Sequence, residues 1–264
     1  MRNFIINARK SLNSYSVANF SSLLEYLEKK DIGSVCYGIV NNPTVKEGLD
    51  KLNDHYFMKS KYRDELLYQE YMRLDNYYLY HDDWIMSISG YFFQKYPEIL
   101  KSFHKRGSAM REDKIIQSDI KQFRDDFYQK IDIEMKSVVD YCKYRDKNFD
   151  YMYNNPDSDY YKALFLTSFL TCRLTCLYLC QEMFEERTNP NFYLNEIAYK
   201  ENIMLVARSM DQLCRELKDN EFDKLIDVYK EGLIHEYNMY DQAEKNYKQG
   251  RGGEELLTRD LYRH

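Results

Sequence analysis

Glycine and proline are scarce in this sequence, with 9 glycines and 4 prolines among 264 residues. Because these two residues most often interrupt helices and strands, their scarcity predicts long, uninterrupted elements. The chain also lacks a convincing strand pattern and an internal repeat of fixed period. A fibrous or repeat architecture is therefore excluded, and helices are the expected elements.

Basic residues are not in surplus either. The chain has 38 Lys and Arg against 43 Asp and Glu, a formal net charge of -5 and a pI near 5.7. This balance argues against a protein that mainly binds the phosphate backbone of nucleic acid. A basic protein partner is easier to accommodate.

Paired cysteines and a leader sequence are missing as well. The 6 cysteines are scattered without paired spacing, which is typical of a reducing compartment. Residues 1–16 contain no apolar run long enough for the core of a signal peptide. We therefore expect a cytoplasmic protein, in its own cell or in a host cell.

One long apolar stretch stands out in a chain of which 31% is charged. In the stretch 162–184, Arg173 is the single charged residue between Ala163 and Gln181. A helix that is apolar on every side belongs in a large core or in a membrane. A charge at the midpoint of a span costs about 2.5 to 3.5 kcal/mol even on the lenient insertion scale. We therefore predict a buried central helix at about 162–185 and no membrane association.

Three-four spacing of apolar residues predicts the remaining helices. They are expected at 17–30, 45–55 (with Thr44 as its cap), 62–95, 111–144, 194–217 and 222–247, with a connector at 31–43. The predicted fold class is all-α, a multi-helix bundle of long antiparallel helices around the central helix. It forms one domain over 1–264, or two helical halves at 1–153 and 158–264, and 249–264 form a flexible hinge with a short terminal helix.

The predicted helix at 62–95 carries two stripes. A regular seam is expected to be buried and consists of Leu67, Tyr71, Leu74, Tyr78, His81, Ile85, Ile88 and Phe92. A second stripe lies on an adjacent face and consists of Tyr77, Tyr80, Trp84 and Tyr91. This stripe either packs against the C-terminal half of the chain or stays partly exposed as a partner-binding surface, where Tyr and Trp contribute strongly. Nearby acids at Asp75, Asp82 and Asp83 would suit a basic partner.

Three ionisable residues occupy otherwise apolar stripes: His81, Arg173 and Glu236. Buried charges are costly unless they are paired. We predict a buried polar network that fixes the helix register, with Glu236 as the first choice of partner for Arg173. The alternative is that these residues line a cavity for an anionic ligand.

Two motifs provide an enzymatic alternative. Glu25-x-x-Glu28 and Glu47-x-x-Asp50 resemble the metal site of the all-α nucleoside-triphosphate pyrophosphatases, in which such carboxylates on two helices hold Mg²⁺ against a diphosphate. The resemblance implies Mg²⁺ or Mn²⁺ as cofactor. We prefer the interpretation that these are solvated acids at helix ends.

The dipeptide His81-Asp82 resembles that of the HD phosphohydrolases, with His55 and His104 as further candidate ligands. On an ideal helix, however, Asp82 is turned by about 100° from His81, which lies on the buried seam. A core histidine bonded to a neighbour is the interpretation that we prefer.

Because the sequence holds no complete catalytic set and no cofactor fingerprint, it predicts a non-enzymatic helical module that binds another protein. Inhibitors and immunity or antidefence proteins, which block a partner, are of this kind. No catalytic residue, metal or cofactor is assigned in this interpretation, and the oligomeric state stays open.

Overall fold

A computed structural model describes residues 34–57, 65–104, 111–131, 135–170 and 207–250. Several predicted features lie outside these residues. They are the helix at 17–30, the carboxylates Glu25 and Glu28, the stretch 171–185 with Arg173, the start of the helix at 194–217, and residues 251–264.

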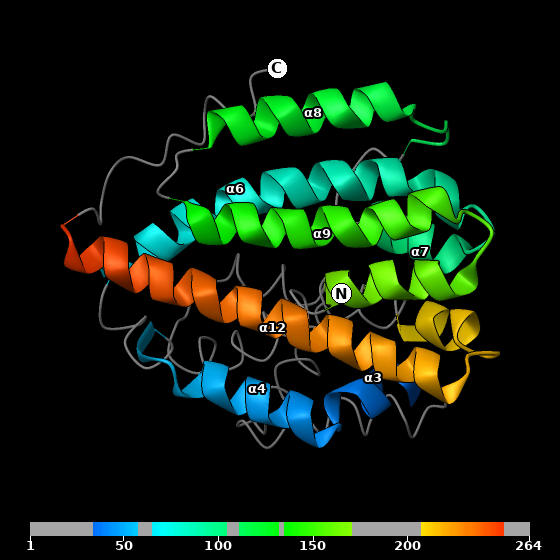
Figure 1. Ribbon diagram of the computed structural model, residues 1–264, viewed down its shortest axis with the longest axis horizontal. Helices are drawn as coiled ribbons and strands as arrows, with labels where there is room; N and C mark the ends of the chain where they lie inside the picture. The colour runs from blue at the N-terminus through cyan, green and yellow to red at the C-terminus, as the bar shows by residue number, and fades with distance from the viewer. Residues whose placement is uncertain (1–33, 58–64, 105–110, 132–134, 171–206, 251–264) are drawn as a thin grey trace, which may run out of the picture.

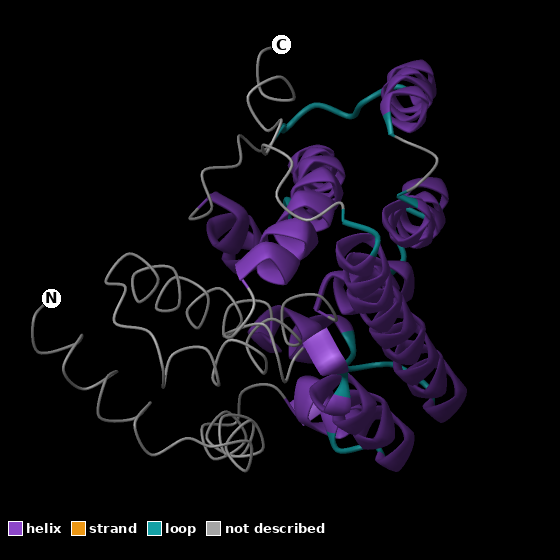
Figure 2. Cartoon of the chain, turned by 90° about the vertical axis from the view of Figure 1, so that its left-hand side faces the viewer, coloured by secondary structure: helices purple, strands orange, loops and turns teal. Residues whose placement is uncertain are grey.

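The described residues form helices and loops. The elements are α3 (Ser34–Val40), α4 (Pro43–Asp54), α6 (Glu65–Ser89), the 3-10 helix η1 (Gly90–Phe93), α7 (Pro97–His104), α8 (Gln117–Lys130), α9 (Lys136–Asn154) and α12 (Asp219–Lys248). Residues 159–170 and 207–213 are helical as well. Within these ranges there is no strand, and the all-α prediction is confirmed (Figure 2).

Helix α12 connects two groups of helices. It packs against α6 and α9, which lie side by side, and against α4 and α3 on its other side (Figure 1). Helix α8 lies outside α6 and α9 in the same view. Residues before and after the loop at 155–158 therefore contribute to one hydrophobic cluster.

The predicted seam is buried, since all eight of its residues lie in the core, seven on α6 and Phe92 on η1. Tyr78 stacks on Tyr141 of α9 with ring centroids 4.2 Å apart. Tyr71 lies 5.3 Å from the ring of Tyr240 of α12. The seam thus faces the two long helices that hold the bundle together.

The described part of the predicted central helix also lies in the core. Every residue from Lys162 to Leu170 is buried. The ring of Phe165 lies 6.1 Å from Phe93 and 6.0 Å from Phe149. No helix in the part of the chain that the structure describes is both long enough and apolar enough to cross a membrane.

Two predicted boundaries near the N-terminus are wrong. Helix α3 occupies part of the expected connector at 31–43, because Cys36 and Ile39 on one side of it are buried. Asn42, and not Thr44, caps α4: its Oδ1 accepts the backbone N–H of Thr44 at 3.0 Å. Pro43 then provides the first residue of the helix, where its missing N–H costs nothing.

The predicted single helix at 111–144 is also wrong, because the chain forms two helices, α8 and α9. Ile131 has an extended backbone and ends α8, and Met135 precedes α9. Both side chains are buried, so the residues on either side of the break are anchored in the core. The apolar spacing of the expected helix at 111–144 predicts a buried Ile116, but Ile116 occupies the N-cap position of α8 and is 62% exposed.

Candidate partner-binding site

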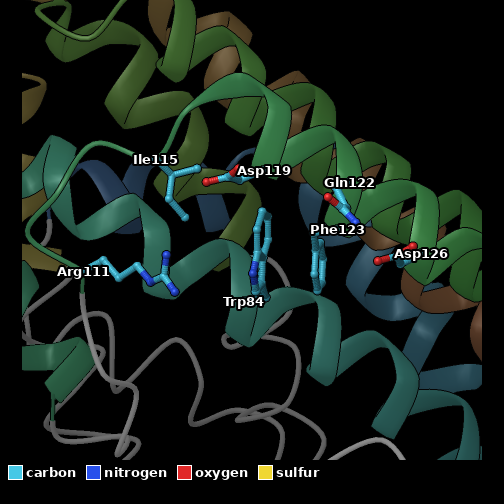
Figure 3. Close-up of a pocket in the computed structure, with 7 residues that line it drawn as sticks. All are labelled: Trp84, Arg111, Ile115, Asp119, Gln122, Phe123 and Asp126. Carbon is cyan, nitrogen blue, oxygen red and sulfur yellow. The ribbon is translucent and has the colours of Figure 1, made fainter. Parts of the chain in front are cut away.

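Trp84 and Phe123 form a stacked pair between α6 and α8. Their ring centroids are 3.7 Å apart and the ring planes differ by 5° (Figure 3). Both side chains are half-buried. Tyr80 approaches the same helix, with its ring 6.1 Å from both Phe123 and Phe127. Helix α8 therefore covers part of the second stripe of α6.

An open pocket of about 330 Å³ lies at this pair. It is lined by Trp84, Arg111, Ile115, Asp119, Gln122, Phe123 and Asp126. In Figure 3 the polar side chains of α8 project along one flank of that helix, and Arg111 lies on the other side of Trp84 from Phe123. The exposed side chain of Ile116 is next in sequence to Ile115.

The spacing of residues along α8 places the acids at the pocket. Asp119, Phe123 and Asp126 follow one another at steps of four and three, so they share one side of the helix. Ile120 and Phe127 point into the core. Both Asp119 and Asp126 are exposed, and neither forms an ion pair with another described residue.

A charged cluster behind the pocket attaches α8 to its neighbours. Asp146 of α9 accepts a hydrogen bond from the Tyr128 hydroxyl at 2.7 Å. Arg124 Nε lies 2.8 Å from Asp146 Oδ1, and its Nη2 lies 2.9 Å from Asp150. His81 Nε2 of α6 lies 3.2 Å from Asp146 Oδ1. Asp146 thus links α8, which carries four of the pocket residues, to both α6 and α9.

The electrostatics of this cluster keep Asp146 ionised. Burial by itself would raise the pKa of the Asp146 carboxyl, but His81, Arg124 and Tyr128 together lower it below its ordinary value. Burial raises the pKa of the Tyr128 hydroxyl, and the charge of Asp146 raises it further. At neutral pH the cluster therefore contains a carboxylate and a neutral phenol.

This lowered pKa predicts a loss of stability in acid. Asp146 binds a proton more readily in the unfolded chain, where its pKa is about 3.9. Its contribution is therefore present above about pH 4 and is lost as the pH falls through the lower pKa of the folded state. We expect the free energy of unfolding to fall more between neutral and acidic pH for the wild type than for Asp146→Asn. Urea titrations measure this, with the exposed Asp125→Asn as control. An equal pH dependence of the wild type and Asp146→Asn would contradict the assignment.

The buried network differs from the predicted one. Arg145 of α9 is fully buried, and its Nε donates to Asp82 Oδ1 at 2.8 Å. Its Nη1 donates to the Phe165 carbonyl at 3.3 Å and to the Ser168 hydroxyl. Asp82 was predicted to be available to a basic partner, and this is wrong because it is fully buried. Asp82 follows His81 on α6 and is rotated to a different side of the helix. His81 lies where α9 meets α8, whereas Asp82 lies where α9 meets Phe165. The rotation therefore does not bring Asp82 to the surface.

The predicted network members have separate partners. His81 is buried beside Asp146 and lies 4.8 Å from the ring of Phe127. Glu236 is buried and accepts the Tyr141 hydroxyl at 2.7 Å. Since Arg173 lies outside the described residues, its pairing with Glu236 stays a prediction.

The members of the second stripe have different environments. Tyr77, Tyr80, Trp84 and Tyr91 are all half-buried against the core. Of these four, Trp84 alone lines the described pocket. Tyr91 meets Phe92 edge-on at 5.2 Å. The pocket therefore centres on Trp84 and residues of α8 that the stripe did not include.

Of the residues of the enzymatic alternative, Glu25 and Glu28 lie outside the described part of the chain, so the four-carboxylate set stays a prediction. Glu47 pairs with Lys51 at 2.8 Å on an exposed face of α4, which Asp50 also occupies. His81 and Asp82 are enclosed in the core beside Asp146 and Arg145. Within the described ranges, no three His, Cys, Asp or Glu side chains are grouped so that they could hold a metal ion.

In the part of the chain that the structure describes, the helices thus form an all-α bundle with an aromatic pocket that has an acidic flank. No protein-family model, curated protein or solved structure matches the chain. Its function is therefore argued from this site.

Proposed function

We propose that the protein is a helical protein-binding module and that the pocket between α6 and α8 receives a basic segment of its partner. The observation that carries this proposal is the stacked pair of Trp84 and Phe123 beside the exposed carboxylates of Asp119 and Asp126. Binding there would cover a basic surface of the partner and so block it, as an inhibitor does.

The apolar part of the pocket suits a protein partner. Aromatic residues held on rigid helices are typical of the residues that dominate interface energetics. Ile116, at 62%, is the most exposed large apolar side chain among the described residues, and it adjoins the pocket residue Ile115. An apolar side chain of the partner could cover the edges of Trp84 and Phe123.

The charge of the pocket favours a basic segment. Two exposed carboxylates, Asp119 and Asp126, line it together with one guanidinium group, Arg111. Asp83, next in sequence to Trp84 on α6, is exposed as well. Complementary charge of this kind steers association and excludes partners of the wrong sign.

Replacing Trp84 tests the proposal. Affinity capture from the native source identifies a partner, and the dissociation constant is then measured with the purified partner. We expect Trp84→Ala to weaken the complex by at least about tenfold, because truncating a central aromatic anchor costs more than 1.4 kcal/mol. Circular dichroism should show an unchanged helical fold.

A matched control is Tyr151→Ala, which removes an aromatic side chain that is 44% exposed on α9 and does not line the pocket. It should leave the affinity unchanged. Equal affinities of the wild type and Trp84→Ala would contradict the proposed surface.

A screen for Mg²⁺- or Mn²⁺-dependent release of phosphate from nucleotides tests the enzymatic alternative, and a positive result would contradict a purely binding role.

A further inference from the structure

Resting on the proposed function, we infer that the partner segment is an α-helix with two cationic side chains seven residues apart and an apolar side chain between them. The partner segment is thus specified by its secondary structure and by the spacing of its charged side chains along α8. It comes from the positions of Asp119, Phe123 and Asp126 on α8.

The two carboxylates define a distance and a direction. At a rise of about 1.5 Å per residue, seven residues separate Asp119 from Asp126 by about 10.5 Å along α8. Seven steps of about 100° return to within about 20° of the starting direction, so both side chains leave the helix on the same flank. Figure 3 shows both on that flank.

A helical ligand reproduces this spacing. Cations at positions i and i+7 of a helix lying along α8 are separated by the same distance of about 10.5 Å and share one face. An extended segment does not, because side chains on one face of a strand repeat at about 6.7 and 13.3 Å. Residues three apart in a strand have the right separation but point to opposite faces. The spacing of the acids therefore favours a helix in a groove, a common recognition mode.

The aromatic pair lies between the two charged positions. Phe123 follows Asp119 by four residues and precedes Asp126 by three, and Trp84 stacks on it. A partner residue at i+3 or i+4 therefore lies over the pair, and an apolar side chain suits that position. The recognised pattern is cation, apolar residue, cation at i, i+3 or i+4, and i+7.

Three synthetic peptides test this pattern. The first is an alanine- and glutamine-rich helix with Lys at i and i+7 and Leu at i+3 and i+4. The second has the same composition with the lysines at i and i+5, and the third has Glu in place of both lysines. All three lack Trp, so that Trp84, the single tryptophan of the chain, reports occupancy of the pocket by its fluorescence. Circular dichroism establishes that the peptides are equally helical.

We expect the i, i+7 peptide to bind up to about fivefold more tightly than the i, i+5 peptide, because the i, i+5 peptide can form only one of the two exposed ion pairs. The Glu peptide should bind least. Charge reversal in Asp119→Lys/Asp126→Lys should abolish the preference. Asp125→Lys is the matched control, since Asp125 is an exposed acid of α8 that does not line the pocket, and it should keep the preference.

The outcomes separate the inference from the proposed function. If both lysine peptides bound equally tightly and their binding still depended on Asp119 and Asp126, the inferred helical spacing would be overturned. A site for a basic segment would remain. Absence of a Trp84 response to all three peptides would overturn the register as well. The proposed function would then be decided by the Trp84→Ala measurement with the whole partner.

Discussion

Replacing the buried arginine in Arg145→Met is expected to lower the free energy of unfolding by about 3 to 5 kcal/mol, the usual result of removing one partner of a buried ion pair. Arg145 and Asp82 are both fully buried, and Arg145 Nε lies 2.8 Å from Asp82 Oδ1. The variant leaves a carboxylate enclosed in the core without its counter-charge. Chemical denaturation in urea measures the difference.

The cost comes from the stranded carboxylate more than from lost packing. Methionine is unbranched and flexible and can fill much of the space near Met86, to whose sulfur Arg145 Nη2 donates at 3.5 Å. Asp82 Oδ2 accepts no hydrogen bond from another described side chain, so the guanidinium group is the main compensation for that charge. Burial alone would lower the pKa of Arg145, but Asp82 raises it, and the guanidinium group therefore stays charged.

Two further variants make this prediction specific. Lys147→Met changes the same helix two residues later, where Lys147 pairs with Glu231 at 3.1 Å on the surface, and exposed pairs contribute little. Its effect should be within the error of the titration. Arg145→Met/Asp82→Leu removes both charges and should recover most of the loss, because apolar pairs often replace buried ion pairs without cost. A double variant as unstable as Arg145→Met would show that packing, and not charge, is responsible.

The long helices could be predicted from the sequence because their apolar residues repeat without interruption. The helix expected at 222–247 is α12 at Asp219–Lys248, and the seam expected in 62–95 is buried along α6. Glu221 accepts the backbone N–H of Lys218 at 2.9 Å, and acids and lysines stand at the favourable ends of α12. Local signals and tertiary packing agree there.

The buried ion pair could not be predicted in this way. Arg145 lies among Lys143, Asp146 and Lys147, so the local sequence has the composition of a solvated helix face. What distinguishes Arg145 is contact with residues 63 and 20 positions away in the chain, Asp82 and Phe165. No periodicity within α9 contains that information.

The candidate site was predictable in part. The second stripe of α6 indicated Trp84, but the apolar spacing of the expected helix at 111–144 predicted that Phe123, which stacks on Trp84, would be a core residue. The break between Ile131 and Met135 lets α8 lie over α6 as a separate helix and brings Phe123 to Trp84. The acids at Asp119 and Asp126 were visible in sequence at a spacing of seven, but only the placement of α8 shows which surface they flank.

A cavity in the core, made by truncating Phe165, should lower the free energy of unfolding by as much as the loss of the Arg145 charge. Phe165→Ala is expected to reduce the free energy of unfolding by about 3 to 5 kcal/mol, as Phe to Ala changes in well-packed cores do. Phe165 is fully buried between Phe93 and Phe149, which come from η1 and α9. The measurement therefore tests whether residues 159–170 pack as an integral part of the bundle. Tyr161→Ala, at a half-buried position of the same segment, is the control and should cost about 1 kcal/mol.

The effect of Phe165→Ala on stability should depend on whether the buried ion pair of Arg145 is present. The Arg145 guanidinium lies 5.0 Å from the centroid of the Phe165 ring, so truncating the ring removes a cation–π contact as well as packing. Residues in contact give non-additive changes, and the double variant Phe165→Ala/Arg145→Met should therefore lose less stability than the sum of the single variants, by about 0.5 to 3 kcal/mol. Additive losses, or a Phe165→Ala protein as stable as Tyr161→Ala, would mean that Phe165 does not support the pair. Coupling of the expected sign would show that the apolar segment at 162–170 stabilises the bundle both by its volume and by enclosing the charge that links α6 to α9.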